Sequence, residues 1–160
     1  MMSQLKDLLA HHAWADAVFF HAWGGSAAQD DAELRTRVAH VVDVQEGFLK
    51  VLKGEAFALP ERPLPDYAEL KTRCRASHEV YAALARTLDD TTLAQPVRIP
   101  WFPEPPCIVS GTDALMQVCL HTQHHRGQNM ARLKALGVAP RNVDYLIWLW
   151  KQKPEPRWDG

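Results

Sequence analysis

Four segments of the sequence carry apolar residues at helical spacing along one face only. They cover residues 3–23, 31–53, 66–88 and 112–136 approximately. A helix with a single apolar stripe has to bury that stripe against another element. Four such helices in one chain therefore predict an all-α fold, a four-helix bundle.

Glycines and one acidic pair mark the expected helix ends. Gly24 follows the first segment, Gly54 the second and Gly137 the last. Glycine is common just beyond a helix end, because it adopts the left-handed backbone conformation without strain. The third helix is expected to begin at Asp66, with Glu69 three residues later in a capping-box arrangement.

Two connections between these helices are long and rich in proline. Residues 54–65 form a crossover between the second and third helices. Residues 93–111 link the third and fourth helices, and their prolines exclude a helix. Within this long loop we expect two short extended pieces, at 97–99 and 108–109.

Aromatic residues are also frequent outside the four helices. We expect Trp101 and Phe102 to fold onto the bundle, because apolar surface is costly to leave in water. The aromatic segment 142–150 packs against the bundle or faces a partner subunit. Residues 154–160 are expected to fray, so that residues 1–153 form a single domain.

The composition excludes several classes of partner. Lys and Arg number 18, Asp and Glu number 19, and the net charge is −1. Binding to nucleic acid or to an anionic membrane would favour a basic excess, so we expect neither. Because the sequence has no apolar run long enough for a bilayer and no secretion signal, we expect a cytoplasmic protein. Three cysteines without a CxxC pair argue against a disulfide framework or a four-cysteine zinc site.

The run HTQHHRGQ at residues 121–128 carries the strongest chemical signal. At about 100° per residue, His121 and His125 share the inward face of the last helix, whereas His124 points away. His40 of the second helix also leans into the bundle. Two imidazoles one turn apart can reach one metal ion, so we predict a divalent metal held by His40, His121 and His125. The alternative is a set of hydrogen-bonded histidines at the edge of the core.

Three neutral imidazoles leave coordination positions open, which is typical of a catalytic rather than a structural metal site. A water bound there would ionise more readily, and the thiolate or carboxylate of a substrate could bind in its place. Imidazole suits several metals, with zinc or nickel expected ahead of iron or manganese. The HExxH motif of zinc proteases is absent, because Thr122 stands where that motif has glutamate.

The sequence assigns no general base, and three residues are candidates for catalytic roles. His12 and Asp16 lie four residues apart on the core side of the first helix. They support the metal ligands, or Asp16 serves as a base, or the two form a buried polar contact within the first helix. Arg126 either clamps an acidic group of a substrate or pairs with a carboxylate on a neighbouring helix. The remaining histidines are interpreted as surface or edge residues: His11, His21 and His78.

Several of these runs together resemble one known family, the DinB/YfiT-like superfamily. HTQHHRGQ is the most specific match, and residues 14–16, Trp-Ala-Asp, are similar to a motif of the family's first helix. His40 with Gly54 and the closing residues 144–146 extend the resemblance over nearly the whole chain. It implies a four-helix bundle, commonly dimeric, with a divalent metal on the three histidines. Asp16 replaces the asparagine that is more usual in the family.

The resemblance also guides the expected function, since members of known activity are similar to metal-dependent thiol transferases and thiol-linked isomerases. We expect a metal-dependent enzyme for a small molecule. It would be a transferase that binds a low-molecular-weight thiol as thiolate, or a hydrolase. The alternative is a non-catalytic, dimeric metal-binding or interaction module in which Trp148 and Trp150 cover a partner. A plain structural bundle whose histidines never meet is the third reading.

Overall fold

Four long helices make up most of the structure, a computed structural model that describes residues 2–102, 104–139 and 141–159. They are α1 (Met2–Gly24), α2 (Ala32–Leu52), α3 (Tyr67–Thr87) and α5 (Gly111–Ala135). Their bounds agree with the four amphipathic segments of the sequence to within a residue or two at most ends. The predicted all-α bundle is confirmed.

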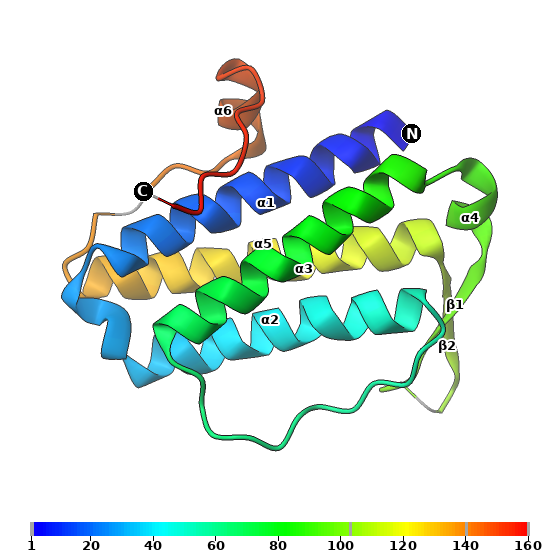
Figure 1. Cartoon of the computed structure of the whole chain (residues 1–160), viewed down its shortest axis with the longest axis horizontal. Helices are drawn as coiled ribbons and strands as arrows, with labels where there is room; N and C mark the ends of the chain where they lie inside the picture. Colours follow the sequence, from blue (N-terminus) through cyan, green and yellow to red (C-terminus); the bar gives the residue numbers. More distant parts are fainter. Residues whose placement is uncertain (1, 103, 140, 160) are drawn as a thin grey trace.

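The long crossover sets the order of the helices in the bundle. α1 packs against α3 and α5, and α2 packs against the same two helices. The consecutive helices α1 and α2, joined through the short 3₁₀ helix η1 (Ala27–Asp30), are therefore diagonal partners. Figure 1 shows residues 53–66 running back along the bundle, so that α2 and α3 point the same way. α1 and α5 run in the opposite direction.

Side-chain caps and glycines define the helix ends. The Asp66 carboxylate accepts a hydrogen bond from the Glu69 backbone N–H at 2.8 Å, which confirms the predicted start of α3. A reciprocal capping box is formed at α5, between Ser110 and Asp113. Gly54 and Gly137 have φ angles of +73° and +84°, the left-handed conformation expected beyond a helix end.

The connection between α3 and α5 contains three short elements. α4 (Asp90–Ala94) is followed by two strands, β1 (Pro96–Ile99) and β2 (Cys107–Ser110). The strands pair antiparallel, with Val97 opposite Val109. The two extended pieces predicted from the sequence are confirmed, and they form a hairpin at one end of the bundle (Figure 1).

A polar layer crosses the middle of the bundle between two apolar clusters. One cluster gathers around Trp23 and includes Val143, Trp148 and Trp158 of the C-terminal segment. The other joins the beginnings of α1 and α5 to the hairpin, around Leu115. Each long helix contributes residues to both clusters and carries buried polar side chains where the two clusters meet. These side chains are His12, Asp16, Gln45, Ser77, His78, Thr122 and Arg126.

The C-terminal segment folds back on the bundle. α6 (Tyr145–Trp150) buries Trp148 but leaves Trp150 77% exposed. Trp158 is buried, and its ring lies 6.1 Å from that of Phe20 and 5.7 Å from that of His78. The expected fraying of residues 154–160 therefore does not hold at Trp158, because an aromatic side chain attaches the end of the chain to the bundle.

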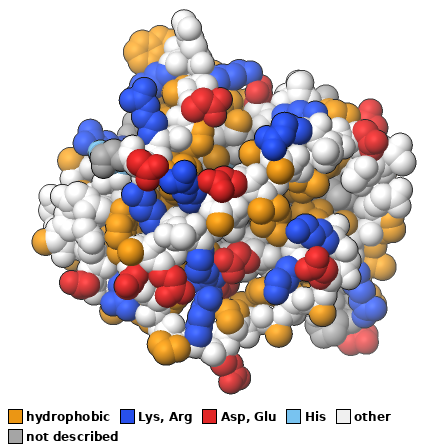
Figure 2. Space-filling view, viewed as in Figure 1, with side chains coloured by type: hydrophobic (Ala, Val, Ile, Leu, Met, Phe, Trp, Pro, Cys, Tyr) orange, Lys and Arg blue, Asp and Glu red, His pale blue; other side chains and the backbone are white. Residues whose placement is uncertain are grey.

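The surface mixes charges of both signs. Figure 2 shows Lys and Arg side chains next to Asp and Glu across the face that carries α1, α2 and α3. One such contact joins α2 and α3, where Arg73 lies 2.7 Å from both Asp43 and Glu46. Within the described residues, no helix is both long and apolar enough to cross a membrane.

Candidate metal centre and buried polar network

Three histidines meet between α2 and α5. The Nε2 atoms of His40 and His121 lie 3.2 Å apart, and one ligand atom from each of His40, His121 and His125 falls within 4.8 Å of the others. Metal–nitrogen bonds of 2.0–2.1 Å in a tetrahedral site would separate neighbouring nitrogens by about 3.3 Å. The three imidazoles therefore converge, and their spacing fits one metal ion. They lie at the edge of the bundle rather than on its inward face, because His40 is exposed and His121 and His125 are only half-buried. Binding of a metal stays a prediction.

A glutamine orients one of these imidazoles. The Nδ1–H of His125 donates to Oε1 of Gln128 at 2.9 Å. This hydrogen bond leaves the Nε2 lone pair of His125 free for a metal, the arrangement common around metal-bound histidines. The amide nitrogen of Gln128 lies 3.1 Å from Nε2 of His124, which stands outside the cluster.

The environment favours the neutral forms of His121 and His125. Partial burial, reinforced by the neighbouring histidines His125, His40 and His124, lowers the pKa of His121 to about 4. Burial also lowers the pKa of His125, although its hydrogen bond to Gln128 acts in the opposite direction. Neutral imidazole is the form that binds metals, so the lone pairs are available at neutral pH.

An apolar cavity opens beside the cluster. It measures about 800 Å³, and His40 and His121 form part of its wall. The rest of the wall comes from α2, the crossover, the hairpin and the first turns of α5. A small molecule in this cavity would lie against two of the three histidines.

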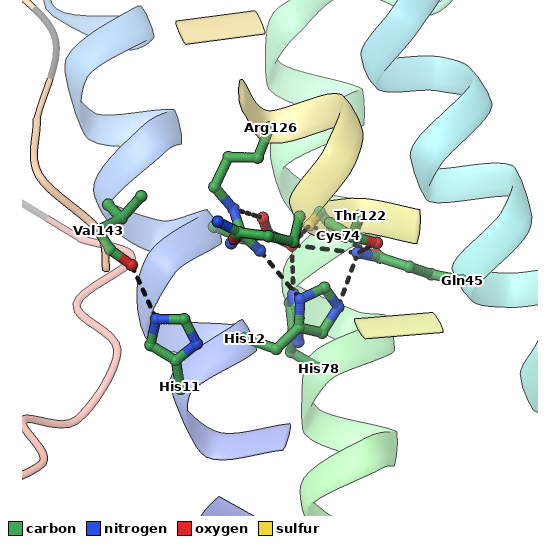
Figure 3. A network of polar contacts seen from close by, with 10 residues as sticks. His11, His12, Gln45, Cys74, His78, Thr122, Arg126 and Val143 are labelled. Atoms are coloured by element: carbon green, nitrogen blue, oxygen red, sulfur yellow. Dashed lines mark hydrogen bonds and ion pairs between the residues drawn. The ribbon is translucent and has the colours of Figure 1, made fainter. Parts of the chain in front are cut away.

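A second group of ligand-type residues lies inside the bundle and is buried. Oδ2 of Asp16 accepts from Nε2 of His78 at 2.8 Å and from the amide nitrogen of Gln45 at 3.1 Å. The other oxygen, Oδ1, accepts from Nε of Arg126 at 2.8 Å. Figure 3 shows how side chains from all four long helices converge on this network. We refer to His12, Asp16, Gln45, His78 and Arg126 as the inner network.

Charge pairing controls the ionisation of the inner network. Burial alone would raise the pKa of Asp16, but the Arg126 guanidinium and the hydrogen bond from His78 hold it well below its usual value. Burial lowers the pKa of His12 well below its ordinary value. Arginine has no acceptor, so Nδ1 of His12, 3.0 Å from Nη2 of Arg126, accepts and the imidazole is neutral.

The inner network is a poor place for a metal, although His12, Asp16 and His78 come within 4.8 Å of one another. N–H groups of Arg126 already occupy Oδ1 of Asp16 and Nδ1 of His12. A cation would have to displace the guanidinium and leave that charge buried. The donor set therefore favours the three-histidine cluster as the metal centre.

The structure shows where the side chains of the catalytic candidates lie. Arg126 pairs with a carboxylate on a neighbouring helix, Asp16, rather than facing the cavity. His12 and Asp16 are both buried, each contacts Arg126, and neither belongs to the three-histidine cluster.

Two histidines are buried, contrary to the sequence interpretation. His78 follows the buried Cys74 by four residues, so helical spacing could have placed it in the core row. His11 lies among aromatic rings and contacts the carbonyl of Val143 at 2.8 Å, a partner that helical spacing does not indicate. His21 is exposed, as expected.

The fold and the cluster define the class: an all-α bundle with three histidines converging beside an apolar cavity. The family model of the DinB family matches residues 1–158, nearly the whole chain. The chain therefore belongs to the DinB family. Searches among curated proteins and among solved structures gave no match.

Proposed function

We propose that this DinB-family protein is a metal-dependent enzyme acting on a small molecule, with His40, His121 and His125 as the metal ligands. One observation carries the proposal: three imidazoles converge at ligand spacing beside a cavity of about 800 Å³. Three neutral ligands leave coordination positions for water or substrate, which is typical of catalytic metal sites. Zinc or nickel is expected first, then iron or manganese.

The chain's own residues would position the reacting groups. Gln128 fixes the tautomer of His125, and burial keeps His121 neutral. His40 and His121 are shared by the cluster and the cavity wall, so a substrate in the cavity would have one end at the cluster. When bound, a divalent metal would supply Lewis-acid activation of a thiol or of water, the basis of thiol transfer or hydrolysis respectively.

Exposed apolar residues on α6 support a second proposal, an interaction surface. Leu146 is 73% exposed and Trp150 is 77% exposed, although both lie in an aromatic helix. A homodimer through this helix is compatible with the enzyme and with a non-catalytic module. Metal-dependent turnover separates these two functions.

The first test is the metal content of the purified, untagged protein. Wild type and His124→Ala should each hold about one divalent ion per chain, because His124 stands outside the cluster. His40→Ala, His121→Ala and His125→Ala should each lose most of the metal. Elemental analysis after reconstitution with zinc, nickel, iron or manganese measures this.

Two outcomes would contradict the proposal. One is a wild type that holds no metal after reconstitution. The other is a loss in His124→Ala as large as that in His125→Ala, since the two residues are neighbours but only His125 belongs to the cluster. Thiol-transfer and hydrolysis screens then follow with the metal that binds.

A further inference from the structure

We infer that the cavity beside His40 and His121 binds a flat, aromatic molecule whose body carries no negative charge. The inference rests on the proposed function, because it names the substrate class of the same site. The low-molecular-weight thiol expected from the family would then be accompanied by a second, apolar reactant, or would itself carry an aromatic body.

Aromatic side chains from three separate segments form the wall of the cavity. Phe48 comes from α2, Phe57 from the crossover, and Trp101 and Phe102 from the connection between β1 and β2. The Trp101 ring lies 5.1 Å from that of Phe48, nearly perpendicular to it, and 6.3 Å from that of Phe57. Such a group offers ring faces and edges against which another flat ring can pack.

Part of this aromatic surface is left in contact with solvent. Trp101 is 40% exposed and Phe102 is 56% exposed, so the expected folding of these two residues onto the bundle is incomplete. An apolar molecule in the cavity would cover surface that the chain leaves in water. The volume also lies within the range of small-molecule sites, about 300–1,000 Å³.

Apart from His40 of α2, the polar and charged side chains of the wall lie along one side of α5. Asp113, Gln117 and His121 follow one another at intervals of one helical turn and all line the cavity. At 1.5 Å per residue, this column is about 12 Å long. A ligand held along it would have its reactive end at His121 and its far end near the Asp113 carboxyl group.

The charges of the wall discriminate against an anionic body. Among the described residues that line the cavity there is no Lys or Arg, and Asp113 is acidic. Lys50 lies 5.9 Å from the centre of the Phe57 ring but is not part of the wall. A negative group at the Asp113 end would therefore meet a carboxyl group and no Lys or Arg among the described residues of the wall, whereas a neutral or ammonium group would be accepted.

Three naphthalene probes that share one ring system but differ in charge test the inference by calorimetric titration. They are 2-naphthalenemethanol, 2-naphthylmethylamine and 2-naphthalenesulfonate, added to zinc-loaded and metal-free protein. We expect the alcohol and the amine to bind both forms, and the sulfonate to bind about tenfold more weakly or worse. Asp113→Asn should remove the preference for the amine over the sulfonate in large part.

Two tryptophan variants locate the binding. Trp101→Ala should weaken the binding of 2-naphthalenemethanol about tenfold or more. Trp150→Ala, at an exposed position on α6, should leave the Kd of the same probe unchanged. Equal affinity for all three probes, or an unchanged Kd in Trp101→Ala, would overturn the inference. Probe binding without any metal uptake would contradict the proposed function alone, and metal uptake without probe binding would contradict this inference alone.

Discussion

Adjacent residues on α5 face two different environments. His121 and His125 lie at the partly exposed cluster, whereas Thr122 and Arg126, one position further along, are buried in the interior. A step of about 100° along a helix separates the two faces. The buried Arg126–Asp16 pair therefore ties α5 to α1 on the helix face next to the one that carries the ligands.

Replacing Arg126 with Met should destabilise the fold by about 3–5 kcal/mol, because the Asp16 carboxylate would remain buried without its partner. Arg132→Met is the matched control on the same helix, since Arg132 pairs with Asp31 at the surface. The control should cost about 1 kcal/mol or less. Urea unfolding of the metal-free variants measures both losses in the free energy of unfolding. Equal losses would show that the buried pair contributes no more to stability than the surface pair.

At the residue scale, the sequence predicted relations within a helix better than relations between helices. The separation of His124 from His121 and His125 follows from the helical period alone. Arg126 pairing with Asp16 depends on which helix lies opposite, and the sequence left that alternative open. His11 was misplaced for the same reason, because its partner Val143 lies far along the chain.

Among the elements, α5 contains a glycine in its interior without a packing reason. Gly127 lies well inside Gly111–Ala135, and a Cβ atom added there would meet nothing within 4 Å. Glycine in a helix interior is less favourable than alanine because it loses more backbone freedom on folding. The position is therefore open to a stabilising substitution.

Gly127→Ala should raise the free energy of unfolding by about 0.5–1 kcal/mol. Gly24→Ala is the opposite control, because an added Cβ atom would lie 2.1 Å from the Tyr67 hydroxyl oxygen. Thermal unfolding followed by circular dichroism compares the two variants. A lower midpoint for Gly127→Ala would mean that the backbone of the motif needs the freedom of glycine.

The four long helices and the two extended pieces were predicted, whereas the short helices η1, α4 and α6 were not. Apolar periodicity and glycine stops fixed the four long helices, since both signals are local. The two extended pieces were also found, but their pairing of Val97 with Val109 depends on the loop that joins them. α4 was not expected, because five residues are too few to show a helical period.

For the whole molecule, the polar layer makes stability depend on pH. Burial lowers the pKa of His12 well below 6.5, so this histidine takes up a proton more readily in the unfolded state. The contribution of neutral His12 to the free energy of unfolding is therefore fully present above about pH 6.5. It is lost as the pH falls below that value. Asp16, whose pKa is also lowered, adds a loss in the same direction at more acidic pH.

We expect the free energy of unfolding of the metal-free protein to be nearly constant above about pH 7 and to fall between pH 6.5 and 4. His12→Asn should make this slope shallower, because it removes a buried titrating group. His21→Asn, at an exposed position, should leave the slope unchanged. Denaturant titrations at a series of pH values measure the slope, and a His12→Asn curve parallel to wild type would contradict the prediction.

The packing order of the helices could not be predicted from the sequence. One-sided stripes require the four helices to bury one another, but they do not say which pairs are diagonal. The structure places α1 and α2 diagonally, and the crossover lets α2 and α3 run in parallel. This arrangement brings His40 of α2 next to α5, so the cluster depends on the topology of the whole chain.

The cavity has helical residues at one end and connecting loops at the other. His40 and His121 belong to long helices that the core holds in place, whereas Phe57 and Trp101 belong to the two proline-rich connections. Loops tolerate changes of length and sequence far better than helices do. Descendants of this chain, natural or selected in the laboratory, can therefore acquire a new cavity shape while they inherit the histidine spacing unchanged.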